Sequence, residues 1–159
     1  MFKWLDSPKA LFGILRVAAA AAIAAGVWLS LNCGVLQTLQ RTENAPGAGY
    51  VVTALINCLF WCIAWGSFIS ICNRMIKGKS AFTQENSRAL QVIGASVSLM
   101  AAVMCVRALP RMISSPDVYL LIEAVILPGT FLTVAVLAFI LSRLLKQAMD
   151  LEEEQADVV

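Results

Sequence analysis

The sequence predicts an all-α integral membrane protein, a four-helix bundle whose N-terminus and C-terminus are both cytoplasmic. Of its 159 residues, 60% are hydrophobic and 14% are charged, whereas soluble domains carry about 25% charged residues. Four apolar runs are separated by short polar segments, and each is close to the length of about 20 residues that a helix needs to cross a bilayer. The Lys and Arg residues concentrate in alternate segments, as is typical of multi-pass membrane proteins.

The four runs organise the chain as a single membrane domain over residues 1–159. The net charge of +2 is too small to suggest direct nucleic-acid binding, and the basic residues lie in segments that would face a membrane surface. The predicted spans are residues 17–36, 50–72, 90–109 and 118–141, with a cytoplasmic loop at 73–89 and a cytoplasmic acidic tail at 142–159.

Capping and turn residues mark where the helices begin and end. Asp6 or Ser7 can cap a first helix that begins at Pro8, because proline suits the first helical position. A basic start before an apolar run is also the pattern of a signal peptide. We favour an uncleaved span, because the run is longer than a usual signal core and three more follow it. Pro110 should end the third span, and residues 115–117 should start the fourth.

The loop between the second and third spans carries a dense block of positive charge. Arg74, Lys77 and Lys79 follow the second span, and Arg88 precedes the third. Such charges mark cytoplasmic loops, because Lys and Arg are costly to move through a bilayer against the potential. Gly78 suits the C-terminal end of a helix. The loop is either an orienting connection or a docking surface for anionic lipid or a cytoplasmic protein.

The end of this loop has the features of a helix start. Thr83 is the expected N-cap, and Glu85 falls in the first turn, where a carboxylate suits the helix dipole. Phe82 can anchor in the headgroup region. The candidate contacts to a partner or to lipid are Arg74, Lys77, Lys79, Phe82, Glu85 and Asn86 in the loop and Glu152, Glu153 and Glu154 in the tail.

The distribution of Lys and Arg predicts the orientation. Nine of the twelve lie on the side of the termini and the central loop, and three lie on the opposite side. This asymmetry places both termini and the central loop inside. The nine are Lys3, Lys9, Arg16, Arg74, Lys77, Lys79, Arg88, Arg143 and Lys146, and the three are Arg41, Arg107 and Arg111.

The central segment resembles a family signature. Its residues Gly78, Phe82, Thr83, Glu85, Asn86, Leu90, Ile93 and Gly94 are similar to the pattern of the bacterial domain-of-unknown-function 2975 family, "Gly, Pro-Phe-Thr, x, Glu-Asn, then Leu and Ile-Gly". The tail at 151–159 resembles the acidic closing motif of that family, and Ala81 and Val158 depart from its pattern. The resemblance implies a small multi-pass protein of the bacterial inner membrane without assigned activity. It also suggests a link to the small helix-turn-helix regulators beside which members are often encoded.

Small residues recur every four positions in three spans, a spacing that lets helix backbones approach closely in lipid. We therefore predict a tight bundle built mainly from the first three spans. The stripes are Ala18, Ala22, Gly26, Ser30 and Gly34 in the first span, Ala54, Cys58, Cys62, Gly66 and Ser70 in the second, and Gly94, Ser98 and Ala102 in the third.

Glu123 is the one acid inside a predicted span, and a carboxylate there needs a partner, water or a proton. Arg107 in the third span is the candidate partner in a structural ion pair. A proton or cation site in a small transporter is the alternative. Pro128 cannot donate to the carbonyl of Ala124, so we expect a kink and a free acceptor there. The break either lines a ligand cavity or has no such role.

The reactive residues predict no cofactor, no metal site and no enzyme activity. The chain has no His, Cys58 and Cys62 lie in mid-span, and we find no phosphate loop, nucleophile elbow or catalytic dyad. Cys33 and Cys105 both fall near the outer ends of their helices. A bridge between them stays open, and free thiols that act as small hydrophobic residues are favoured.

Two functions from different classes fit the sequence. The first is a regulatory or scaffolding membrane protein whose loop and acidic tail engage a cytoplasmic partner, such as a helix-turn-helix transcription regulator. The second is a small transporter or ligand-binding bundle that uses Glu123 and the break at Pro128. The lipid bilayer is a partner in either case, and formation of a homo-oligomer stays open.

Overall fold

The computed structural model describes residues 8–31, 48–114 and 118–156. These residues form helices α1 (Pro8–Ser30), α3 (Ala48–Ile76), α4 (Gln84–Ser114), α5 (Val118–Leu121), η2 (Ile122–Ile126) and α6 (Leu127–Ala156). The described helices include 4 that are long and apolar enough to cross a membrane, which confirms the predicted all-α multi-pass protein. By length and composition, the helices that can hold a span are Pro8–Ser30, Val51–Ile76, Gln84–Leu109 and Ala124–Gln155.

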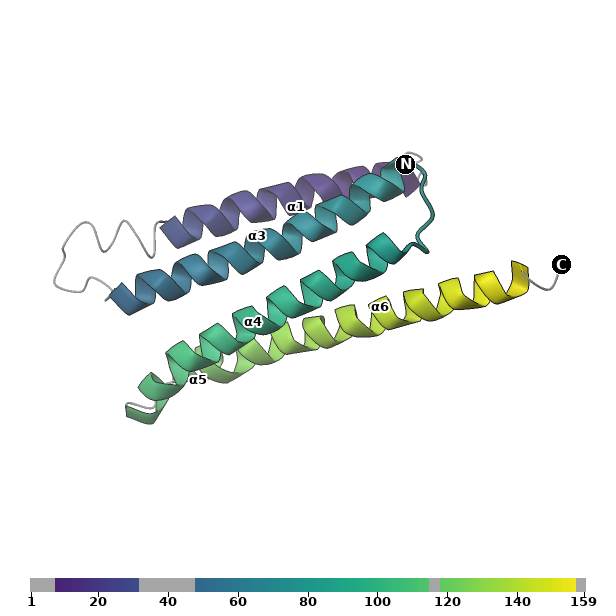
Figure 1. Ribbon diagram of the computed structural model, residues 1–159. Coiled ribbons are helices and arrows are strands. Elements are labelled where there is room, and N and C mark those ends of the chain that lie inside the picture. Colours follow the sequence, from purple (N-terminus) through teal and green to yellow (C-terminus); the bar gives the residue numbers. More distant parts are fainter. Residues whose placement is uncertain (1–7, 32–47, 115–117, 157–159) are drawn as a thin grey trace.

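The long helices pack in chain order, α1 on α3, α3 on α4 and α4 on α6 (Figure 1). The described start of α1, the connection between α3 and α4, and the end of α6 lie at the same end of the molecule (Figure 1). The most extensive pairing joins α4 to α6. The first three spans pack on one another as expected, but the fourth helix also takes part, in the most extensive single contact.

One helix boundary differs from the one that the sequence suggests. α4 does not end at Pro110 but continues to Ser114. A proline removes one backbone hydrogen bond, and membrane helices tolerate that loss when other groups satisfy the freed carbonyl. The end of α6 agrees with the sequence. Apolar residues at helical spacing from Leu141 to Leu151 predict that the last helix continues beyond the span at 118–141, and α6 does continue to Ala156, so much of the acidic tail is helical.

Helix α1 meets α3 at Gly26. A side chain at position 26 would overlap the indole ring of Trp61, and the Trp61 Nε1 donates a hydrogen bond of 2.9 Å to the carbonyl of Ala22. Trp61 also contacts Trp65 edge to face, with ring centroids 5.6 Å apart. Ala22 and Gly26 thus lie on a packing face, as predicted, but an indole fills it; Ala18 is exposed, and Gly34 lies outside the described residues. Gly66 is exposed, with nothing within 4 Å of an added Cβ, so its predicted packing role is wrong.

Helix α4 meets α6 through small residues that recur at heptad spacing, which is typical of left-handed helix packing. At Gly94 an added Cβ would lie 3.0 Å from the ring of Phe139 and 3.2 Å from the carbonyl oxygen of Ala135. The two helices are therefore so close here that even a methyl group would require a small shift of the Phe139 ring or of the α6 backbone. The buried small residues are Ser87, Gly94, Ala101 and Ala108 on α4 and Ala135, Ala138 and Ser142 on α6.

Candidate functional site

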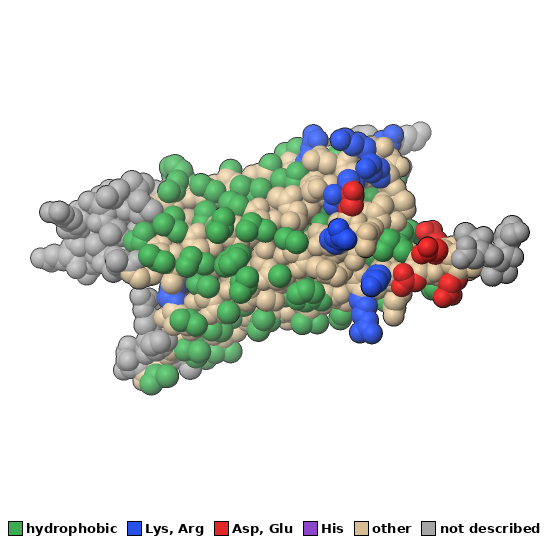
Figure 2. Space-filling view, in the orientation of Figure 1, with side chains coloured by type: hydrophobic (Ala, Val, Ile, Leu, Met, Phe, Trp, Pro, Cys, Tyr) green, Lys and Arg blue, Asp and Glu red, His purple; other side chains and the backbone are tan. Residues whose placement is uncertain are grey.

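Charged side chains gather towards one end of the molecule, with acidic groups at the tip beyond the basic ones (Figure 2). We call this the basic end. It contains the start of α1, the connection between α3 and α4, the first turns of α4 and the last part of α6. Its Lys and Arg residues are Lys9, Arg16, Arg74, Lys77, Lys79, Arg88, Arg143 and Lys146, and Lys3 lies outside the described residues.

Helix α3 ends in a Schellman motif, with Gly78 two residues after its last residue, Ile76. The N–H of Lys79 donates to the carbonyl of Arg74 at 3.2 Å, and the N–H of Gly78 donates to the carbonyl of Met75 at 3.0 Å. Gly78 has a φ of 73°, a left-handed conformation that glycine adopts without a Cβ penalty. The prediction that Gly78 ends the helix is confirmed.

Thr83 caps the start of α4, as the sequence predicts. Its Oγ1 accepts a hydrogen bond of 3.2 Å from the N–H of Asn86, which satisfies one of the free donors of the first turn. The side chain of Asn86 is buried, and its Nδ2 donates to the carbonyl of Ala81 at 3.0 Å. The Thr and Asn of the signature therefore fix the shape of the loop.

Arg74 ties the end of α3 to the start of α4. Its Nε donates to the Oδ1 of Asn86 at 2.7 Å, and its Nη1 donates to the Oγ of Ser70 at 3.1 Å. The same Nη1 lies 3.6 Å from the Oε2 of Glu85. The structure thus brings together Arg74, Glu85 and Asn86, three of the predicted contact residues. Their polar groups bind one another, and a role in binding a partner stays a prediction.

The remaining predicted loop contacts are accessible. Lys77, Lys79 and Phe82 are all exposed. Within the described part of the chain, no ion pair links these two lysines or Arg74 to the acidic residues of the tail. The loop cations and the tail acids therefore do not close the basic end over each other.

A pair of serines fastens α4 to α6 at the basic end. The Oγ atoms of Ser87 and Ser142 lie 2.9 Å apart. The Ser87 hydroxyl is 3.1 Å from the backbone carbonyl oxygen of Ser142. The Ser142 hydroxyl is 3.0 Å from the backbone carbonyl oxygen of Ser87. Both side chains are buried, so one hydroxyl can donate to the other while the second donates to a carbonyl.

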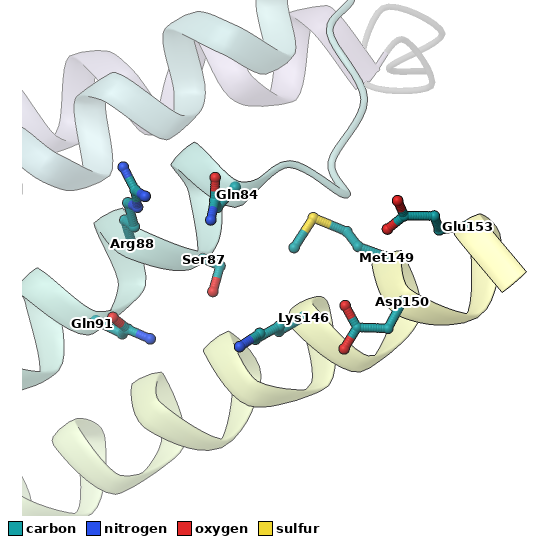
Figure 3. A pocket seen from close by; sticks show the side chains of 8 residues that line it. All are labelled: Gln84, Ser87, Arg88, Gln91, Lys146, Met149, Asp150 and Glu153. Atoms are coloured by element: carbon teal, nitrogen blue, oxygen red, sulfur yellow. The ribbon is translucent and has the colours of Figure 1, made fainter.

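A cavity of about 430 Å³ opens beside this serine pair. Figure 3 shows the side chains that α4 and α6 contribute to it. The cavity carries charges of both signs, with two cations and two carboxylates among its lining groups. The lining residues are Gln84, Ser87, Arg88, Gln91, Lys146, Met149, Asp150 and Glu153.

The acidic tail divides between this cavity and the open surface. Glu153 lines the cavity, whereas Glu152 and Glu154 are exposed outside it. Leu151 is 58% exposed. The last turns of α6 extend beyond the first turn of α4 (Figure 1), so this part of the helix presents an apolar side chain and acidic groups on its surface.

The break at Pro128 takes the form of a π-helical turn. In η2 the N–H of Leu127 donates to the carbonyl of Ile122. Pro128 has no N–H to offer Ala124, and the Sγ of Cys105 on α4 lies 3.8 Å from the Ala124 carbonyl oxygen as a donor. The freed acceptor that the sequence predicts is therefore met by a thiol, and Pro128 itself is buried.

Of the two side chains in the predicted membrane ion pair, the structure describes only that of Arg107. Arg107 is half-buried near the end of α4. The side chain of Glu123 lies outside the described residues, so both the pair and the transporter alternative stay predictions. Cys105 is a free thiol, and Cys33 lies outside the described residues.

A known protein family matches the part of the chain that forms the basic end, apart from α1. The family described as "Protein of unknown function (DUF2975)" matches residues 50–159. The chain belongs to this family. No curated protein matches the chain, and no solved structure matches it. The DUF2975 match includes the loop, the serine pair, the cavity and the tail, whereas α1 lies before it.

Sequence reasoning missed the cavity and the serine pair. Ser87, Gln91, Lys146 and Asp150 are separate polar residues in the sequence, and nothing in their spacing joins the first turns of α4 to the end of α6. A heptad count along α4 is the signal that would have found the interface, because Ser87 begins the series of small residues that packs on α6.

Proposed function

We propose that this DUF2975 protein is a scaffold or regulator in the bacterial cytoplasmic membrane, with both termini inside. Its docking element for a soluble partner is the end of α6. The concentration of Lys and Arg at the basic end supports this orientation, because positive residues are retained on the cytoplasmic side. The same end carries the tail, which therefore meets soluble proteins of the cytoplasm.

The observation that carries the proposal is the projection of α6 beyond α4. Glu152 and Glu154 are exposed on the projecting turns. Leu151, on the same turns, is 58% exposed. A membrane helix needs no such extension to cross the bilayer. An apolar side chain among carboxylates fits a partner with a basic surface around an apolar groove.

A helix-turn-helix regulator has the required chemistry, and the family resemblance suggests one. Its DNA-binding face is basic because it must neutralise phosphates. An acidic helix that binds this face would compete with DNA. Binding to the tail would therefore hold the regulator at the membrane and keep it from its operator.

The test uses full-length protein in its native host with a mild crosslinker. We compare the wild type with Glu152→Gln/Glu154→Gln, which removes the exposed charges and leaves the cavity residue Glu153 in place. The captured soluble protein is then purified and titrated against the protein in nanodiscs. We expect binding that weakens at least about tenfold in the double variant, since each lost charge pair contributes to affinity and association rate.

Arg143→Gln is the matched control, because Arg143 is exposed on the same helix outside the cavity. It should leave partner binding unchanged. Capture that is equal in wild type and the double variant would contradict docking on the tail. The same holds if no soluble protein binds the wild type in nanodiscs.

A further inference from the structure

We propose that the cavity between α4 and α6 binds the headgroup of a zwitterionic phospholipid with a primary ammonium, as in phosphatidylethanolamine. This inference goes beyond the docking of a soluble partner, and it uses a different surface. The cavity is large enough for a headgroup at about 430 Å³. It lies where the apolar spans give way to the charged basic end, so we place it at the level of the lipid headgroups.

The charges in the cavity are ordered along the helix axes. Lys146 lies just past the apolar run of α6, after Ser142 and Arg143, and Asp150 lies four residues further from the bilayer, about 6 Å along the axis. Glu153 lies beyond Asp150. Because α4 runs in the opposite direction, Arg88 and Gln91 lie deeper than the first residue of that helix. Donors thus line the membrane side of the cavity, and carboxylates line the outer side.

This order matches the chemistry of phosphoethanolamine. The phosphate adjoins the glycerol and the acyl chains, and a two-carbon bridge carries the ammonium away from it. A phosphate at the level of Lys146 can accept charge-assisted hydrogen bonds from the lysine and from Gln91. The ammonium can then donate to Asp150. Figure 3 shows Gln91 and Lys146 pointing toward one another from the two helices, with Asp150 further along α6.

The polar groups needed for this contact are not used elsewhere in the described structure. Neither Lys146 nor Asp150 forms an ion pair or hydrogen bond with another described residue, although they are one turn apart. Towards the bilayer centre, Val92 and Phe139 are exposed apolar side chains on the same pair of helices. They offer an adjoining surface for the acyl chains.

The charged cavity and the packed interior lie on different sides of α4 and α6, and this is why we expect the ligand to come from the surrounding bilayer. There Asn86, Leu90 and Leu145 line an apolar cavity with side chains of α1 and α3. The charged cavity is therefore on the outward side of the α4 and α6 pair. A headgroup can enter it sideways from the membrane without any helix moving.

The test measures lipid binding to the full-length protein in detergent by native mass spectrometry. The probes are phosphatidylethanolamine, phosphatidylglycerol and phosphatidylcholine with the same short acyl chains. We expect phosphatidylethanolamine to bind at least about tenfold more tightly than the other two, because only its headgroup satisfies donors and carboxylates together. Lys146→Gln and Asp150→Asn should each remove about this preference.

The control variants are Arg143→Gln and Glu152→Gln, which change one charge of each sign on the same helix outside the cavity. They should leave the preference unchanged. The exchange Lys146→Asp/Asp150→Lys keeps the net charge but reverses the order, and it should abolish the preference. A melting curve without lipid checks that each variant is folded.

Three results would overturn the proposal. The first is equal or tighter binding of phosphatidylglycerol that Asp150→Asn does not weaken, because the site would then attract anions in general. The second is the absence of any headgroup preference in the folded wild type. The third is loss of soluble-partner capture in Lys146→Gln and Asp150→Asn, because the cavity would then belong to the protein interface. Loss of partner capture in Glu152→Gln/Glu154→Gln has no bearing on the cavity.

Discussion

The two helix pairs of the molecule are held together in different ways. In the pair of α4 and α6, backbones meet directly over Gly94, and a buried serine pair bonds across the interface. In the pair of α1 and α3, the indole of Trp61 fills the space over Gly26 and bonds to the carbonyl of Ala22. The first contact is fixed by two main chains, whereas the second depends on one side chain.

This difference separates a rigid unit from an adjustable one. Main-chain atoms cannot move aside without shifting a whole helix, but an aromatic side chain can change rotamer. The rigid pair carries the cavity and the projecting tail at the basic end. The family match also covers α4 and α6 in full and begins after α1. The candidate sites therefore lie on the part of the molecule with the tightest packing.

The largest effect should come from Gly94→Leu. The new side chain would press on the ring of Phe139 and on the backbone at Ala135, so α4 and α6 must separate. We expect a loss of about 3 kcal/mol in the free energy of unfolding, at the upper end of the usual cost of overpacking. Reversible unfolding in mixed micelles measures it. Gly66→Leu is the control, because nothing lies within 4 Å of its added Cβ.

A smaller loss should follow Gly26→Leu. The leucine would displace the Trp61 indole and break its hydrogen bond to the Ala22 carbonyl, but the α3 backbone can stay in place. We expect about 1 to 2 kcal/mol from the same unfolding measurement. The comparison between the two helix pairs would be wrong if this variant were less stable than Gly94→Leu.

The serine pair should contribute less than either packing contact. Ser87→Ala and Ser142→Ala should each cost about 0.6 to 1.7 kcal/mol, the range measured for hydrogen bonds between membrane helices. The double variant should cost less than the sum of the two, because the hydroxyls bind each other. Strict additivity in the double-mutant cycle would mean that the pair does not act as a unit.

The smallest effect should come from the thiol at the π-helical turn. Cys105→Ala removes the donor to the Ala124 carbonyl, and a thiol is a weak donor. We expect a loss of about 0.5 kcal/mol, at the lower limit for a protein hydrogen bond. Cys105→Ser should recover the loss, because a hydroxyl donates more strongly. Equal stability of the alanine and serine variants would show that the contact is not a hydrogen bond.

Local chemistry made much of the fold predictable. Length and polarity sufficed to predict four helices long enough to cross a membrane, and the caps at Gly78 and Thr83 follow from conformational preferences of single residues. The acceptor freed by Pro128 was also predictable, because proline lacks an N–H. The group that donates to this acceptor was not predictable, since the Cys105 thiol belongs to another helix. A stripe of small residues likewise shows that a face permits close packing but not which helix covers it, as Gly66 and Gly94 demonstrate.

The candidate sites were predictable to different degrees. The tail acids stand out in the sequence because they are adjacent. The sequence does not show which of these acids lines the cavity, because that depends on which side of α6 faces α4. Of the three glutamates, only Glu153 lines it. Arg74 was expected to be available to a partner, but it is held by Asn86 and Ser70. A basic residue in a loop carries no sequence mark that distinguishes a docking group from a structural one.

The most direct test of the account is photo-crosslinking from a single position of the projecting helix. A photoreactive amino acid replaces Leu151 in the full-length protein, and the control replaces Ile113 at the opposite end, which is 81% exposed. The account predicts that the probe at 151 crosslinks a soluble cytoplasmic protein in native membranes and that the probe at 113 does not. Identical products from both positions, or no soluble protein at position 151, would contradict it.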